Sequence, residues 1–155
     1  VDRSGLVDAP LAVSIDIFDR GSQRLNGARV TVNAGQDSIA IATTRGTYDE
    51  QVRSRPIPLV AERRYLAEFE VTIPSGGAAL HVVSTTTKTV LASKYWCAPM
   101  AQATRQSLLF ETASDDVAVE VLLTNCGFPA PVASNFSIRQ LRIWPYREGQ
   151  QRERR

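Results

Sequence analysis

The chain has 155 residues, 43% hydrophobic and 22% charged, which excludes a wholly disordered protein and fits one well-buried domain. The formal net charge is +2, and residues 147–155, with four arginines against two glutamates, carry all of it. A balanced stretch 1–146 argues against nucleic-acid binding, because nucleic-acid-binding domains usually carry a basic face within the fold. No apolar run approaches the roughly 20 residues of a membrane helix, so we expect no direct membrane insertion by this segment.

The first half of the chain alternates apolar with polar residues, a period of two that predicts strands and not helices. Asn26–Gly27 suits a tight hairpin turn with positive φ, because both residue types tolerate that region. Pro56 and Pro58 flank Ile57 and favour an extended segment at a sheet edge. The strands expected in this half cover residues 11–18, 28–32, 38–44 and 47–53.

The segment YLAEFEVTI (65–73) gives the clearest strand pattern of the chain. Its odd-numbered residues are apolar, while Glu68 and Glu70 share the opposite face, where we expect solvent. Within 136–144 the alternation slips by one residue, and a β-bulge near Gln140 would absorb the slip. Further strands are expected at residues 79–85, 87–93, 106–112 and 116–125, the last with Val117, Val119, Val121 and Leu123 on one side.

This succession of short strands without intervening helices predicts an all-β protein, an antiparallel β-sandwich. We find no internal repeat and no linker, so residues 1–146 are expected to form a single domain. The charged stretch 147–155 is expected to be a flexible tail. Since the first residue is Val and not Met, we expect an excised domain or a processed product.

The chain has two cysteines, Cys97 and Cys126, and neither belongs to a CxxC motif. With His81 as the single histidine, a zinc site of the Cys/His type lacks ligands. A disulfide between the two cysteines is expected if the domain lies outside the cytoplasm. The alternative is a pair of buried free thiols.

The order of segments in the second half resembles the galactose-binding-like jelly roll, the fold shared by many carbohydrate-binding modules. The resemblance covers roughly residues 50–146 and rests on hydrophobic positions in a Tyr-x-hydrophobic-x-Phe-x-Val strand and a Phe-x-Ile-x-x-Leu-x-Ile closing strand. These patterns match Tyr65 to Val71 and Phe136 to Ile143. The other matching segments are Pro56–Leu59, Ala79–Val83, Ser107–Thr112 and Val117–Leu123.

The resemblance carries implications for metal, location and parent protein. Such domains often hold a structural calcium near the chain ends, but here only Asp16 and Asp19 could start such a site, so no cofactor is expected. They also occur as extracytoplasmic parts of bacterial membrane glycosyltransferases and polysaccharide-assembly proteins. We therefore expect an extracytoplasmic location (periplasm, cell envelope or secreted) and a larger parent protein.

Candidate catalytic groups are few. The chain lacks a G-x-S-x-G elbow, and one histidine in a strand would have to serve any nucleophilic triad. That histidine, His81, is expected on a solvent-facing sheet surface or in a satisfied polar contact. Glu68 and Glu70 stand about 7 Å apart by strand geometry, a separation that suits an inverting glycosidase. Such a pair on an outward face is more often solvated, so we expect no catalytic residues and keep a hydrolase as a third hypothesis.

Binding without chemistry fits the sequence better. Sugars are held by aromatic rings that stack on their C–H faces and by planar polar groups that bind their hydroxyls. We expect a loop between residues 93 and 106 whose aromatic residues the disulfide would hold at one rim of the sandwich. The alternative for Trp96 is that it packs over the disulfide and closes the core. The candidate ligand-binding residues are Tyr95, Trp96, Arg105, Asn125 and Phe128.

The leading hypothesis from sequence is therefore a non-catalytic glycan-recognition module. Its expected partners are a glycan or polysaccharide and the remainder of a larger parent protein. The alternative hypothesis is a structural or protein–protein interaction domain that packs on the rest of a membrane or cell-envelope protein.

Overall fold

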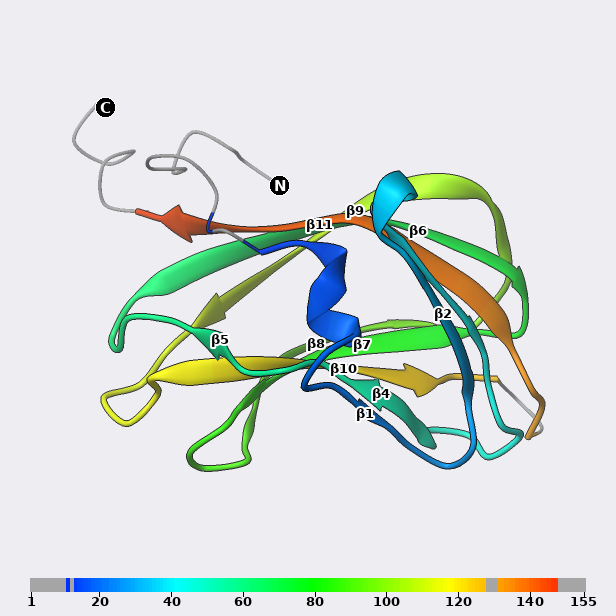
Figure 1. Cartoon of the computed structure of the whole chain (residues 1–155), viewed down its shortest axis with the longest axis horizontal. Helices are drawn as coiled ribbons and strands as arrows, with labels where there is room; N and C mark the ends of the chain where they lie inside the picture. Colours follow the sequence, from blue (N-terminus) through cyan, green and yellow to red (C-terminus); the bar gives the residue numbers. More distant parts are fainter. Residues whose placement is uncertain (1–10, 12, 128–130, 148–155) are drawn as a thin grey trace.

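A computed structural model describes residues 11, 13–127 and 131–147, which form two antiparallel sheets packed face to face (Figure 1). Sheet A has five strands in the order β2 (Arg29–Asn33), β3 (Ser38–Ala42), β11 (Asn135–Tyr146), β6 (Arg64–Ser75) and β9 (Met100–Glu111). Sheet B has six, in the order β1 (Gln23–Arg24), β4 (Glu50–Arg53), β10 (Ala118–Asn125), β7 (Ala78–Ser84) and β8 (Val90–Trp96), with β5 (Ile57–Pro58) also pairing β10. The predicted antiparallel β-sandwich is confirmed.

The core lies between the sheets and is built by the period-two alternation of their strands. In β6 the inward residues Phe69, Val71 and Ile73 are fully buried, as the pattern of residues 65–73 predicts. Leu80 and Leu123 face them from β7 and β10. Full burial of each such side chain contributes roughly 1.5–3 kcal/mol, so this interface dominates the stability of the fold.

Strand β10 begins two residues later than the sequence pattern suggests. Val119, Val121 and Leu123 are buried, but Val117 precedes the strand and is exposed. Its backbone carbonyl accepts a hydrogen bond from Leu59 N instead of taking part in a ladder. The prediction that Val117 joins the core is therefore wrong.

The β-bulge predicted near Gln140 is confirmed. The register between β11 and β6 shifts between Arg139 and Arg142, and Gln140 itself has a φ of 54°. Its backbone N–H donates to the carbonyl of Asp37, 2.9 Å away. Because the bulge inserts one extra residue, both Ile138 and Leu141 can point into the core.

The strand expected at residues 11–18 is wrong, because a 3₁₀-helix, η1 (Ile15–Phe18), forms there instead. Ile15, Ile17 and Phe18 are all buried in it. A strand would send the adjacent residues Ile17 and Phe18 to opposite faces, whereas a helical turn buries both. The turn lies between the two sheets (Figure 1) and contacts β2, β3 and β11.

The turn at Asn26–Gly27 forms with positive φ at both residues, as predicted, but it does not close a hairpin. The strands on either side belong to different sheets, since β1 pairs with β4 and β2 pairs with β3. The turn therefore carries the chain from sheet B to sheet A. The extended edge segment predicted at Pro56–Pro58 is confirmed as β5, which pairs with one end of β10.

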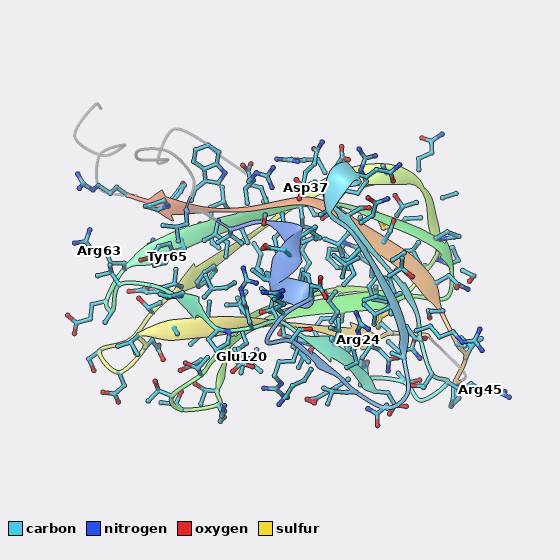
Figure 2. The ribbon with its side chains drawn as sticks, in the orientation of Figure 1. Arg24, Asp37, Arg45, Arg63, Tyr65 and Glu120 are labelled. Carbon is cyan, nitrogen blue, oxygen red and sulfur yellow. A yellow bond between two sulfur atoms is a disulfide. The ribbon has the colours of Figure 1, made fainter. Side chains whose placement is uncertain are left out.

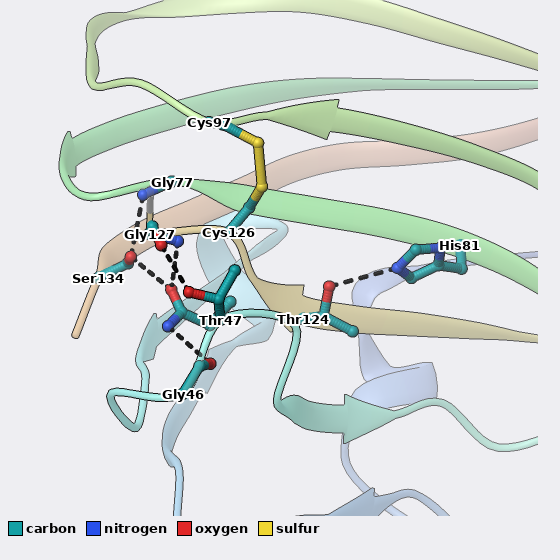
Figure 3. Close-up of a disulfide and its surroundings, with 10 residues drawn as sticks. Gly46, Thr47, Gly77, His81, Cys97, Thr124, Cys126, Gly127 and Ser134 are labelled. Carbon is teal, nitrogen blue, oxygen red and sulfur yellow. Dashed lines mark hydrogen bonds between the residues drawn. A yellow bond between two sulfur atoms is a disulfide. The ribbon is translucent and has the colours of Figure 1, made fainter. Parts of the chain in front are cut away.

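The disulfide between Cys97 and Cys126 is present, with the two Cα atoms 5.1 Å apart. It joins the end of β8 to the end of β10 and crosses over the start of β7, which lies between them (Figure 3). The residue just before β7 is Gly77, and glycine is needed there because a Cβ atom would meet the carbonyl oxygens of Cys126 and Trp96 at 2.2 and 2.6 Å. The bond indicates an oxidising environment.

Within the described part of the chain, none of the helices has the length and apolar character needed to cross a membrane.

Candidate functional site

The outward face of sheet B carries aromatic, apolar, hydroxyl and charged side chains. Its strand register sets these side chains in three rows that run across the strands. Figure 2 shows Glu120 in this layer and Tyr65 in the opposite one. The rows are Tyr95–Ala79–Thr124–Glu50, then Ser93–His81–Leu122–Arg53, then Val90–Val83–Glu120.

A groove of about 590 Å³ lies over the second and third rows. The buried side chains of Val83 and Leu122 give it an apolar floor. Lys88 and Val90 approach from the β7–β8 side, and β1 lies on the other side. This volume is in the range of small-molecule sites. The lining includes Gln23, Leu25, Glu50, Arg53, Val83, Lys88, Val90, Glu120 and Leu122.

Glu120 is the central charged group of the groove, and its side chain is only 10% exposed. Its Oε1 lies 3.7 Å from Lys88 Nζ, and its Oε2 lies 3.8 Å from Arg53 Nε. Arg53 also approaches Glu50, with 3.5 Å between Nη2 and Oε2. Two cations and two carboxylates thus line the groove, and their formal charges cancel.

Next to the groove, at the disulfide end of the sheet, three rings form an aromatic corner of Tyr48, Tyr95 and His81. The Tyr48 and Tyr95 rings meet edge to face with centroids 6.1 Å apart, and His81 meets Tyr95 in the same way at 5.4 Å. Tyr48 and Tyr95 are 56% and 52% exposed, so both keep ring surface in solvent. The backbone N–H of Tyr48 donates to the carbonyl of Asn125, 2.8 Å away, which holds the loop before β4 against sheet B.

His81 is buried under this corner and contacts a hydroxyl on each side. Nδ1 lies 2.6 Å from Ser93 Oγ, and Nε2 lies 3.2 Å from Thr124 Oγ1 (Figure 3). Burial lowers the pKa of His81 below its ordinary value of 6.5, and the nearby negative charge of Glu50 opposes that shift. The sequence-based expectation of a satisfied polar contact for His81 is confirmed, and the ring supports Tyr95 from the sheet.

The loop expected between residues 93 and 106 is wrong, since β8 extends to Trp96 and β9 begins at Met100. Strand alternation then separates the two aromatic residues: Tyr95 faces outward, and Trp96 faces the core. The Trp96 ring packs edge to face on Phe69 with centroids 5.7 Å apart. The alternative interpretation, in which Trp96 closes the end of the core, therefore agrees with the position of its side chain.

Arg105 and Tyr95 do not share a rim, because Arg105 is on β9 in sheet A and Tyr95 is on β8 in sheet B. Arg105 Nη1 donates to Gln140 Oε1 at 3.4 Å, and its Nη2 lies 3.9 Å from Glu68 Oε1. The predicted gathering of Arg105 with the aromatic residues is therefore wrong. Phe128 lies outside the described residues.

Asn125 is fully buried and serves as a hydrogen-bonding hub at the disulfide end. Its amide nitrogen donates to the carbonyls of Thr44, Gly46 and Val132 at 2.9–3.0 Å. Its oxygen accepts from Gly127 N at 3.1 Å and from Ser134 Oγ at 2.6 Å. Asn125 thus joins two loops, the one between β3 and β4 and the one between β10 and β11, and is not at the surface of the groove.

The expectation that Glu68 and Glu70 on β6 are both solvated is wrong for Glu68, which is only 5% exposed. It lies on the outward face of sheet A, where the register sets it between Arg142 and Ser107. Glu70 is half-buried, and its Oε2 lies 4.0 Å from Arg139 Nε. Both carboxylates are therefore near cations on the sheet opposite the groove.

Asp16, which the sequence suggests as one possible start of a calcium site, is bound by protein side chains. Ser14 Oγ donates to it, and Arg55 Nη2 lies 3.2 Å from its Oδ2. The Ser14 hydrogen bond first, and the Arg55 interactions next, lower the pKa of Asp16. In residues 11, 13–127 and 131–147 no three His, Cys, Asp or Glu side chains come together as a metal site.

Sequence reasoning missed most of the groove, although one signal was available. Glu120 and Leu122 alternate with the core residues of β10, so their outward direction could be read from the strand pattern. Tyr48, Arg53 and Lys88 reach the same face from turns and short strands. Their proximity depends on tertiary pairing that local patterns do not contain.

Comparisons with known proteins identify the fold. No protein-family model matches the chain, and no curated protein matches it. Among solved structures, a CBM4 domain superposes with a TM-score of 0.60 at 15% identity over 94% of this chain and 99% of that one. A xylan-binding domain of family CBM22 gives 0.60 at 11% identity, over 90% and 97%.

A third similar structure belongs to a larger enzyme chain. The CBM22-1 and GH10 modules of the Clostridium thermocellum endo-1,4-β-D-xylanase 10B, complexed with xylohexaose, give a TM-score of 0.57 at 15% identity. The match covers 92% of this chain but only 28% of that one. At these identities the likeness establishes fold alone: a β-sandwich of the jelly-roll type found in carbohydrate-binding modules.

Proposed function

We propose that this chain is a non-catalytic carbohydrate-binding module whose glycan lies in the groove on sheet B, against the aromatic corner. The observation that carries the proposal is the exposed Tyr95–Tyr48 pair beside a groove lined by both apolar and hydrogen-bonding side chains. The jelly-roll likeness to carbohydrate-binding modules supports it.

Each part of the site has a physical task in this proposal. A tyrosine ring stacks on the C–H face of a pyranose, and the apolar floor of Val83 and Leu122 faces another such surface. Glu120 and Arg53 exchange hydrogen bonds with sugar hydroxyls. The disulfide and the Tyr48–Asn125 hydrogen bond hold the corner before the glycan arrives, which lowers the ordering cost of binding.

The proposal assigns no role in the groove to Trp96, Arg105 or Asn125, because their side chains lie in the core, on sheet A and in the buried hub, respectively. It retains Tyr95 as the aromatic ligand residue and adds Tyr48. We further propose that the domain is galactose-binding-like and acts in an extracytoplasmic, glycan-handling parent, such as a bacterial membrane glycosyltransferase. The disulfide supports the location, since such bonds persist in oxidising compartments.

Affinity electrophoresis in native gels containing soluble polysaccharides tests this function. Wild-type protein should be retarded by at least one polysaccharide of a panel that includes xylan and mixed-linkage β-glucan. Tyr95→Ala should weaken that retardation by about tenfold, since one lost stacking contact is worth ~1.4 kcal/mol.

Leu109→Ala is the matched control, because Leu109 is an exposed apolar residue on sheet A and should leave retardation unchanged. If Tyr95→Ala is retarded as strongly as the wild type, the proposed binding site is wrong. A wild-type protein that migrates freely through every polysaccharide would contradict the function and favour an interaction domain.

A further inference from the structure

The charged residues of the groove are balanced around one carboxylate. Glu120 stands in the row nearest the β7–β8 hairpin, beside Val83, and its side chain is 90% buried. Each of its oxygens faces a different cation: Oε1 faces Lys88, and Oε2 faces Arg53. A carboxylate placed in this way can control which ligands the cations accept.

The two ion-pair distances leave room for a ligand. Charge-assisted hydrogen bonds between nitrogen and a carboxylate are about 2.7–2.9 Å long. The separations here are 3.7 and 3.8 Å, so both oxygens keep acceptor capacity and both cations keep donors. A hydroxyl group can donate to one oxygen while it accepts from the neighbouring cation. Two adjacent hydroxyls could do this at both oxygens simultaneously.

We propose that Glu120 determines the charge specificity of the groove: it binds an uncharged glycan through adjacent hydroxyls and excludes a glycan that bears carboxylates. This inference rests on the proposed carbohydrate-binding function. A neutral diol completes the hydrogen bonds of Glu120, Arg53 and Lys88 without adding charge. A uronate would compete with Glu120 for the same cations and repel both Glu120 and Glu50.

Glu120→Gln provides a test that separates specificity from a structural role. The substitution preserves size and some hydrogen bonding, but it leaves the groove with two cations and one carboxylate. We expect about tenfold weaker binding of a neutral polysaccharide such as xylan, because a charged acceptor is lost. We also expect the variant to bind polygalacturonate more tightly than the wild type does, and added salt to abolish that gain.

Glu111→Gln is the matched control, since Glu111 is an exposed carboxylate on sheet A that pairs with Arg64 at 3.5 Å. It should change neither binding mode. Lys88→Gln is a second variant, at a side chain that is 67% exposed, so folding should not depend on it. It should weaken binding of xylan without any gain for polygalacturonate.

The outcomes distinguish this inference from the function on which it rests. Wild-type preference for polygalacturonate over neutral glycans would overturn the inference and leave glycan binding in place. So would a Glu120→Gln variant that binds xylan more weakly and gains no affinity for polygalacturonate, because such a loss without a gain indicates a structural role. If the wild type binds neither class, the proposed function itself fails.

Discussion

Two buried polar side chains organise the disulfide end of the sandwich. Asn125 ties together two loops through its amide, and His81 supports Tyr95 between two hydroxyls. Both residues lie on sheet B, one directed inward and one outward. The aromatic corner therefore rests on hydrogen bonds that depend on individual residues as well as on strand pairing.

Asn125→Ala should lower the free energy of unfolding by roughly 2–4 kcal/mol, because it leaves several buried backbone groups without partners. Chemical denaturation followed by tryptophan fluorescence measures this change. Asn135→Ala is the control, since Asn135 is exposed and its amide donates to Ser75 Oγ at 3.0 Å. Its effect should stay within about 0.5 kcal/mol. Equal losses in the two variants would contradict the hub role of Asn125.

His81 should make stability depend on pH near neutrality, because it is the single histidine of the chain and histidine is the side chain whose ordinary pKa lies in that range. Burial lowers its pKa in the folded protein below 6.5, so the unfolded chain binds the proton more readily. The free energy of unfolding should be unaffected by His81 above pH 6.5 and should fall as the pH drops from there towards the folded-state pKa.

Thermal unfolding at about pH 7.5 and about pH 5.5 measures this effect, since carboxylates titrate mostly below that window. In His81→Gln the difference between the unfolding temperatures at these two pH values should be smaller than in the wild type. If the unfolding temperature of the wild type rises on acidification, the pKa of His81 is raised in the folded protein and not lowered.

At the scale of elements, β8 carries both a core residue and a residue of the candidate site. It ends sheet B and pairs with β7, and it carries Tyr95 outward and Trp96 inward. Lys94 Nζ donates to the carbonyl of Ser107 at 3.1 Å, which links the strand to β9 of the other sheet. The disulfide after Trp96 fixes the end of the strand that carries the aromatic corner.

Replacing both cysteines by alanine should cost roughly 3–4 kcal/mol of stability in the chain-entropy model for a loop of this length. Amide hydrogen exchange should then accelerate most in β8, because its neighbour on one side is β7 and its free end loses its covalent anchor. Exchange in β6, which is paired on both sides, is the internal control. Uniform acceleration in β6 and β8 would contradict a local role of the bond.

For the whole molecule, the sequence supports the architecture better than the site. Alternation in 65–73 and the slip before Leu141 specify strand faces, since a sheet with a buried face imposes a period of two. The same logic fails at residues 15–18, where a buried turn satisfies the core as well as a strand would. It fails again for residues 94–105, where the sequence predicts a loop but β8 and β9, joined by a short connection, extend instead.

The site was only partly predictable because sheet order brings it together. The sequence identifies Tyr95 as a candidate, but Tyr48, Arg53, Lys88 and Glu120 come from other segments that become neighbours through pairing of β4, β10, β7 and β8. Local patterns give the direction of each side chain and not its neighbour in space. Arg105 illustrates the limit: it is near Tyr95 in sequence and lies on the other sheet.

The sulfur bridge also decides how this domain would bear mechanical load. A glycan polymer bound at Tyr95, as proposed above, would pull on β8, an edge strand whose ladder hydrogen bonds could break one at a time without the bridge. The Cys97–Cys126 bond transfers that tension past β7 to β10, which is paired on both sides. Tension must then break several ladder hydrogen bonds at once, so β8 should withstand more pulling force than an edge strand without such a bond.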